Sequence, residues 1–247
     1  MDNTIGLLTG NSFVDSLCDD TRARLCSMLR PTRLTKGQVL AERGQNNATV
    51  WFPVHSTISD VMRLVDGVAA EVGIAGHEGL STLSVAFGSL TTINTKIVQA
   101  GGAAFCLGAE HFAEVLQTDS HLRDRLLAYL QYAYLAAMQL AACNGHHLLS
   151  QRYARSLLMA SDRLGSNDLK LTHEDSAQIL GVRRAGVTQA AAAMSKSGLI
   201  RYHRGSLTVL DRERLESSSC ECYAAVNAEL YRCMGYGARK TLLTIAA

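Results

Sequence analysis

The chain has 247 residues, of which 47% are hydrophobic, and a formal net charge of +2 at pH 7, which is the composition of a globular protein with one large domain or two modest ones. Its start does not match a signal peptide and no run of about 18 apolar residues is found, so a cytoplasmic protein is expected rather than a secreted or membrane protein. The seven cysteines are odd in number and lack paired spacing, which argues against a disulfide scaffold; they are Cys18, Cys26, Cys106, Cys143, Cys220, Cys222 and Cys233.

The charge is distributed unevenly along the chain. Residues 1–118 carry eight Lys and Arg against eleven Asp and Glu, whereas residues 147–216 carry eleven against seven. The second segment is therefore the candidate for binding a polyanion.

Residues 30–110 show the two-residue period that is typical of β-strands. Glycines and turn pairs, including Asp66-Gly67, separate the apolar stretches. These stretches lie at 50–54, 58–65, 68–74 and 95–100. The pattern predicts a small antiparallel sandwich or barrel within a first domain of residues 1–118.

The pattern changes to that of one long helix in residues 119–146, expected to end near Asn144-Gly145. A first apolar stripe has heptad spacing and consists of Leu122, Leu126, Tyr129, Ala133, Ala136, Leu140 and Cys143. A second stripe beside it consists of Leu127, Leu130, Tyr134, Ala137 and Ala141. One stripe can pack on the parent domain while the other faces a second copy, and we expect the first to form a homodimer seam. The alternative is a helix buried on both faces within one chain.

Two helices joined by a tight turn are expected in residues 147–216, after another amphipathic helix at 151–165. In LTHEDSAQILGV, Thr172 can cap a helix with Asp175 three residues later. Gly181 allows a tight turn to a second helix that begins at Arg183 or Arg184.

A hairpin at Arg204-Gly205 follows, between LIRYH and SLTVL. The order helix, helix, hairpin is that of a winged helix-turn-helix, and a helical extension at 217–247 completes the chain.

Arg183 and Arg184 stand at the start of the second helix, where a cation opposes the helix macrodipole. Without a polyanion they would be mildly destabilising. An arginine at this position can donate two parallel hydrogen bonds to guanine O6 and N7, or bind a phosphate. We therefore interpret both as DNA contacts; the alternative is that they merely solvate a helix end.

The stretch LTHEDSAQILGVRRAGVTQAAAAMSKSGLIRYHRGSLTVL resembles the winged helix-turn-helix of the Crp/Fnr family of bacterial transcription regulators. The β domain and the long helix before it are similar to other parts of the same family. The resemblance implies an α+β fold with an N-terminal antiparallel β-roll of the cyclic-nucleotide-binding jelly-roll type, a long dimerisation helix and a C-terminal winged helix-turn-helix. It further implies a homodimer that binds double-stranded DNA at an inverted repeat, with RNA polymerase as another partner.

The family's recognition helix carries Arg, then Glu, then Arg four residues after the Glu. This sequence keeps only the first, as Arg184, with Ala185 and Gln189 at the other positions, so the family's usual base sequence is not expected. Gln189 can read adenine through its amide, and Thr188 can contact a phosphate or a thymine methyl. The full set of expected DNA contacts is Thr172, His173, Arg183, Arg184, Thr188, Gln189, Arg201, His203 and Arg204, with His173 binding phosphate best when protonated.

The family's cyclic-nucleotide binders use a Gly-Glu for the ribose and an Arg for the cyclic phosphate. Glu78 matches that acid, but no arginine lies between Arg63 and Arg123, and Lys96 is the one cation in that interval. A lysine lacks the fork that holds a phosphate through two bonds. We therefore expect another small-molecule effector near Glu78, Lys96 and Tyr129, or no effector.

Cysteines and histidines form a last constellation, which consists of Cys143, His146, His147, Cys220 and Cys222. Thiolate and imidazole suit zinc or iron, but neither C-x-x-C nor a His pair at i, i+4 is present. The family's iron–sulfur sensors carry an N-terminal cysteine cluster that Cys18 and Cys26 do not reproduce. We therefore expect packing of small residues here, with no metal and no cofactor.

No serine, histidine or acid lies in a nucleophile elbow or a phosphate loop, so an enzyme is not expected. The sequence favours a homodimeric, sequence-specific DNA-binding regulator. The alternative is a ligand-binding or redox- or metal-sensing module that acts mainly through protein partners.

Overall fold

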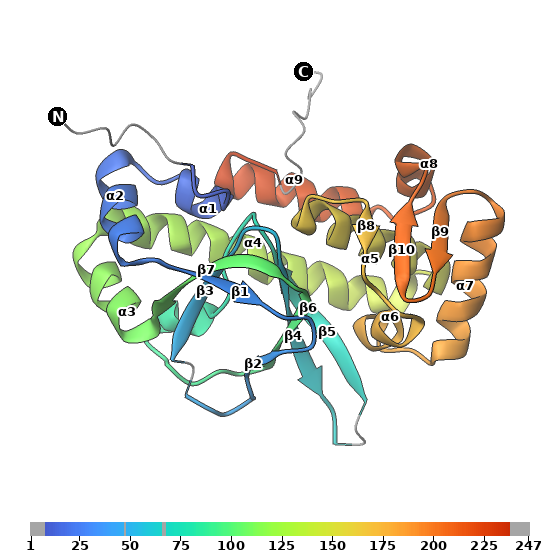
Figure 1. The fold of residues 1–247 in the computed structure, drawn as a ribbon, viewed down its shortest axis with the longest axis horizontal. Coiled ribbons are helices and arrows are strands. Elements are labelled where there is room, and N and C mark those ends of the chain that lie inside the picture. Colours follow the sequence, from blue (N-terminus) through green and yellow to red (C-terminus); the bar gives the residue numbers. More distant parts are fainter. Residues whose placement is uncertain (1–7, 47, 66–67, 238–247) are drawn as a thin grey trace.

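The computed structural model describes residues 8–46, 48–65 and 68–237, which form an N-terminal β-roll, a long helix and a mainly helical C-terminal half (Figure 1). The helices are α1 (Ser12–Asp15), α2 (Asp19–Met28), the 3-10 helix η1 (Leu83–Phe87), α3 (Ala109–Thr118), α4 (Ser120–His146), α5 (Leu149–Leu164), α6 (His173–Leu180), α7 (Arg184–Lys196), α8 (Arg212–Ser217) and α9 (Cys222–Met234). The strands are β1 (Arg30–Leu34), β2 (Val39–Ala41), β3 (Thr49–Pro53), β4 (Thr57–Arg63), β5 (Ala69–Ala75), β6 (Thr95–Ala100), β7 (Gly102–Gly108), β8 (Asp168–Leu169), β9 (Ile200–His203) and β10 (Ser206–Val209).

The β-roll consists of two antiparallel sheets, with strand orders β1-β7-β3 and β2-β6-β4-β5. β4 and β5 pair as a hairpin, although its expected turn, Asp66-Gly67, lies outside the described residues. Alternate side chains of a strand point to opposite faces, and in β3 Val50 and Phe52 are buried. Phe52 meets Phe112 of α3 edge-on, with ring centroids 5.9 Å apart. The expected antiparallel β domain and the α+β class are confirmed.

The long helix α4 runs behind the roll, and α9 lies along it (Figure 1). It begins at Ser120 because the side chain of Asp119 accepts a hydrogen bond from the backbone N–H of Leu122 at 2.9 Å. It continues to His146, so Gly145 lies inside the helix and does not end it as expected. The backbone N–H of His147 donates to the carbonyl of Cys143 and closes the last turn.

The two apolar stripes of α4 have opposite surroundings. Most of the first stripe is buried within this chain, namely Leu122, Leu126, Tyr129, Leu140 and Cys143, with Ala133 and Ala136 half-buried. In the second stripe, the exposed fractions of Leu127 and Tyr134 are 51% and 68%. The expectation that the first stripe forms the dimer seam is therefore corrected, because the roll and the C-terminal half of the same chain already cover it.

Within the described ranges, α4 is also the one helix that is long and apolar enough to cross a membrane by length and composition. Gln131 and Gln139 interrupt its apolar residues, so the expectation that no unbroken apolar run of about 18 residues occurs still holds. α4 contacts β5, η1, α3 and α9, yet only 28% of its most apolar 18-residue stretch is buried. The helix therefore presents an apolar surface that one chain alone does not cover.

The C-terminal half is attached to the roll through an ion pair at the end of α5. Arg163 is 1% exposed, and its Nε lies 3.3 Å from Oε1 of Glu78, which is also buried. The same guanidinium donates from Nη2 to the hydroxyl of Tyr132 on α4. The backbone N–H of Gly76 reaches both carboxylate oxygens of Glu78, at 3.2 and 3.1 Å.

Two glycines allow the close approach around this ion pair. A Cβ on Gly76 would lie 2.4 Å from the carbonyl oxygen of Arg163. A Cβ on Gly79 would lie 2.0 Å from the ring and hydroxyl of Tyr129. Both distances are shorter than any side chain tolerates, so the loop 76–79 can sit against α5 and α4 only with glycine at these positions.

We expect Arg163→Met to lower the free energy of unfolding by about 3 to 5 kcal/mol, because it leaves the buried carboxylate of Glu78 without its cation. The double variant Glu78→Gln with Arg163→Met removes both charges and should recover most of that loss. Urea unfolding followed by circular dichroism, at one protein concentration, measures both. A double variant no more stable than Arg163→Met alone would contradict the ion pair's role.

Candidate nucleic-acid interface

The helix-turn-helix is formed by α6 and α7, and its ends are set by local hydrogen bonds. The hydroxyl of Thr172 accepts from the backbone N–H of Asp175 at 3.0 Å, and the carboxylate of Asp175 accepts from the backbone N–H of Thr172 at 2.8 Å. This is the expected capping box. Gly181 has a φ of 62° and ends α6, and α7 begins at Arg184, as predicted. The side chain of Thr172 is thus occupied by capping.

The outer face of α7 carries the expected readers. Val187, Ala191 and Met194 are buried against the domain core. Arg183, Arg184, Thr188 and Gln189 are exposed on the opposite side. The first turn of α7 contains no acidic residue, and no ion pair involves Arg183 or Arg184 in the described part of the chain. Both guanidinium groups are therefore available to an external anion.

His173, at the start of α6, joins the two helices to the wing. Its ring packs on that of Tyr202 in β9, with centroids 4.2 Å apart, and its Nδ1 lies 3.1 Å from the hydroxyl of Thr188. Burial, with the positive charge of Arg184, lowers the pKa of His173 below its ordinary value. Its Nε2 has no hydrogen-bond partner. In the free protein the ring is therefore biased toward its neutral form, and an approaching phosphate must offset that bias.

The wing is the hairpin of β9 and β10. Its turn has positive φ at both Arg204 (42°) and Gly205 (79°), as in the two-residue turns that suit antiparallel hairpins. The side chains of Arg201, His203 and Arg204 are exposed. β10 also pairs with β8, a two-residue strand that the sequence did not indicate. The structure thus brings all nine expected DNA-contacting residues into one domain.

The expected effector residues lie around one small cavity without forming an open pocket. Glu78 and Tyr129 lie near Arg163, and Lys96 forms an ion pair of 2.6 Å with Asp60, which lines the same cavity as Tyr129. The cavity between the roll and α4, beside Arg163 and Tyr129, has a volume of about 50 Å³. Ligand pockets commonly measure about 300 to 1,000 Å³. The cation that faces Glu78 is Arg163 of α5, which lies outside the interval between Arg63 and Arg123.

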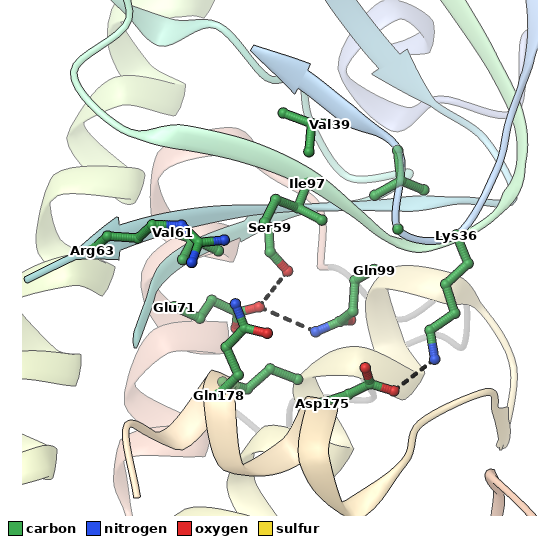
Figure 2. A pocket seen from close by; sticks show the side chains of 13 residues that line it. Lys36, Val39, Ser59, Val61, Arg63, Glu71, Ile97, Gln99, Asp175 and Gln178 are labelled. Carbon is green, nitrogen blue, oxygen red and sulfur yellow. Dashed lines mark hydrogen bonds and ion pairs between the residues drawn. The ribbon is translucent and has the colours of Figure 1, made fainter. Parts of the chain in front are cut away.

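A larger cleft of about 300 Å³ lies between the roll and α6 (Figure 2). Lys36 bridges it by an ion pair of 2.6 Å to Asp175, the capping residue of α6. On the sheet side, the carboxylate of Glu71 accepts hydrogen bonds from Ser59 and Gln99. Burial raises the pKa of Glu71 to about 7, although the bond from Ser59 lowers it. This cleft was not expected, because its walls come from segments about 100 residues apart in the chain.

Comparison with known proteins agrees with this geometry. Residues 151–218 match the Crp-like helix-turn-helix domain. A search of curated proteins finds no significant match. Three similar solved structures are the CRP-family regulator TTHB099 of Thermus thermophilus, the CRP/FNR-family regulator TTHA1359 of the same organism and the c-di-GMP-responsive global regulator CLP of Xanthomonas campestris.

The likeness extends over both halves of the chain at low identity. For TTHB099 the TM-score is 0.64 at 19% identity, over 77% of this chain and 99% of that one. For TTHA1359 the TM-score is 0.55 at 20% identity, over 77% of this chain and 98% of that one. For CLP the TM-score is 0.63 at 14% identity, over 78% of this chain and 99% of that one. The chain therefore has the fold of the Crp/Fnr regulators and carries their Crp-like helix-turn-helix domain at residues 151–218.

Proposed function

We propose that the chain is a cytoplasmic, homodimeric transcription regulator that binds duplex DNA through α7 and the wing. The observation that carries this proposal is the exposed start of α7, where two adjacent arginines lack any carboxylate partner among the described residues. The contacts of His173 with Thr188 and Tyr202 hold α6, α7 and the wing together as one surface. A surface of exposed cations on a helix-turn-helix is the electrostatic footprint of DNA binding.

The roles of the two arginines follow from their positions. Arg184 is the first residue of α7, the end of a recognition helix that enters the major groove, where a guanidinium can pair with guanine. Arg183 precedes the helix with its backbone extended, which suits a phosphate contact at the groove edge. Gln189 lies about one and a half turns further on, so it can read a second base.

The second stripe of α4 is the surface proposed to face a second copy of the chain. Leu127 and Tyr134 of the stripe, and Met138 beside it, are each more than half exposed, and no lysine, arginine or acid occurs between Leu127 and Cys143. Alanines at 137 and 141 are exposed beside them and permit close helix contact. In a two-fold dimer the two α7 helices would enter major grooves about 34 Å apart, so the operator is an inverted repeat with half-sites one helical turn apart.

An effector, if one acts, is proposed to occupy the cleft between the roll and α6 rather than the interior of the roll. The interior cavity is far smaller than a cyclic nucleotide, whereas the cleft reaches the size of a ligand pocket. The cleft also contacts both halves of the chain, through Glu71 on the sheet and Asp175 at the start of α6. A ligand there would bear directly on the placement of the helix-turn-helix.

Arg184→Ala should cost on the order of 1 to 3 kcal/mol per half-site on the selected operator and weaken base preference at one symmetric position. Arg183→Ala should weaken binding to operator and scrambled duplex alike and lower the salt slope by about one unit per half-site. Titrations at several salt concentrations distinguish the two roles. Arg30→Ala, which removes an exposed cation from β1, is the control for net charge.

Equal losses on both duplexes for Arg184→Ala would make it a backbone contact and leave Gln189 as the base reader. If the wild-type chain shows no salt-dependent affinity for any duplex, the alternative of a module acting only through protein partners gains support.

Tyr134→Glu should convert the dimer into a monomer, because it places a charge in a close apolar helix contact. The fold of each chain should survive, since Tyr134 is exposed within the chain. Light scattering after size exclusion measures the mass. His111→Glu, at an exposed position on α3, should leave the dimer intact. A dimer mass for Tyr134→Glu would rule out the second stripe as the seam.

Glu71→Gln should stabilise the protein more at pH 8 than at pH 5. A carboxyl whose pKa is raised in the folded state holds its proton more tightly there than in the unfolded chain, so the wild type loses stability as pH rises from about 4.5 through about 7. The variant cannot ionise and escapes that loss, which we expect to be on the order of 1 to 3 kcal/mol. Urea unfolding at both pH values measures it, with exposed Glu110→Gln as control. Parallel pH profiles for wild type and Glu71→Gln would argue against a buried carboxyl here.

A further inference from the structure

Four potential metal ligands converge where the end of α4 meets the start of α9. Cys143 lies in the last turn of α4, His147 caps that helix, and Cys220 and Cys222 lie at the start of α9. Their ligand atoms all lie within 4.8 Å of one another. The three cysteines are at most 2% exposed. The three cysteines pack together as expected, and the fold also brings His147 to them in a single cluster.

The distances fit one tetrahedral ion. The Sγ atoms of Cys143 and Cys220 are 3.5 Å apart, and Nδ1 of His147 lies 3.4 Å from Sγ of Cys143 and 3.5 Å from Sγ of Cys222. Zinc–sulfur bonds of about 2.3 Å and zinc–nitrogen bonds of about 2.0 Å in a tetrahedron separate the ligand atoms by about 3.5 to 3.8 Å. Only small movements would therefore be needed to admit a zinc ion.

The groups around the cluster are those that support a metal site. The other ring nitrogen of His147, Nε2, lies 3.0 Å from a carboxylate oxygen of Glu221, the carboxylate–histidine arrangement that orients a ligand imidazole. Nε2 of Gln139 donates to Sγ of Cys222 at 3.1 Å, a bond that a thiolate accepts well. Both contacts favour the ligand forms of these side chains.

A buried cation near the cluster, Arg155, makes no close ion pair among the described residues, although its charge acts on the carboxyl of Glu71. Arg155 of α5 is 4% exposed, its Nε has no hydrogen-bond partner, and it forms no ion pair with a carboxylate among residues 8–46, 48–65 and 68–237. Its charge acts on Cys143. Three thiolates with one divalent ion carry a net charge of −1, which would balance this guanidinium.

We propose that Cys143, His147, Cys220 and Cys222 bind one Zn²⁺ ion in a closed tetrahedral site. Binding displaces the three thiol protons, and the four protein ligands leave no position for substrate, as in structural zinc sites. Zinc is the metal expected for three thiolates and an imidazole in tetrahedral geometry. The ion joins the end of α4 to the start of α9 and fixes the two-residue link, His147 and Leu148, that leads into α5.

Metal content of the full-length protein, purified under reducing conditions, tests the proposal. We expect about one zinc per chain by mass spectrometry of the metal, as a single site requires. Cys222→Ser and His147→Gln should bind Zn²⁺ at least about 10-fold more weakly in competition with a chromophoric chelator, and Glu221→Gln about 10-fold more weakly through loss of its contact with His147. Replacement with Co²⁺ should give the intense thiolate-to-metal absorption of a tetrahedral site.

The matched controls are Cys233→Ser, another thiol of α9, and His146→Gln, the exposed neighbour of His147. Both should bind zinc like the wild type. Failure of the reduced wild-type protein to take up Zn²⁺ or Co²⁺ would overturn the proposal, as would equal uptake by His147→Gln and His146→Gln. Circular dichroism establishes that each variant is folded, and His147→Gln, at a half-buried position, keeps the test independent of Cys222→Ser.

Discussion

Burying a guanidinium against a carboxylate costs several kcal/mol of desolvation for each ion, and the cost is met only with good geometry and further hydrogen bonds. Arg163 and Glu78 are 3.3 Å apart, and the hydroxyl of Tyr132 on one side and the backbone of Gly76 on the other supply hydrogen bonds, although Nε of Arg163 makes no hydrogen bond among the described residues. The pair joins the loop of the roll to the last turn of α5. Because Arg163 also lines the small cavity between the roll and α4, the interaction that attaches the C-terminal half borders that cavity.

Features that depend on neighbours in sequence were predictable. The capping box of Thr172 and Asp175, the glycine turn at Gly181 and the hairpin at Arg204 each arise from residues within a few positions of one another, and all three appear in the structure. The heptad spacing of α4 likewise predicted a long helix with two apolar stripes. Which stripe faces inward depends on the elements that pack against the helix, and the sequence pattern alone does not contain that information.

Features that join distant segments were not predictable from spacing. The partner of Glu78, Arg163, lies on a helix 85 positions further on and outside the β domain. The Cys and His cluster combines an i, i+4 pair, Cys143 and His147, with a second pair more than 70 positions away. Sequence patterns identify a metal site made of two ligand pairs when each pair has a known spacing such as C-x-x-C. Neither pair here has such a spacing.

The ion pair of Arg163 with Glu78 and the cluster of cysteines with His147 lie at opposite ends of α5. At its C-terminal end α5 is held by Arg163 and by Asp162, which accepts hydrogen bonds from Arg212 and from Tyr223 of α9. At its N-terminal end the link from α4 is held by His147 and the cysteines. Because α5 contacts both α6 and α7, its orientation influences that of α7 relative to α4. A conformational change that rotates α5 relative to α4, and α7 with it, would have to break the Arg163–Glu78 ion pair or disrupt the cysteine–histidine cluster. A ligand in the cleft beside Asp175 would contact α6 directly and leave both of these sites intact.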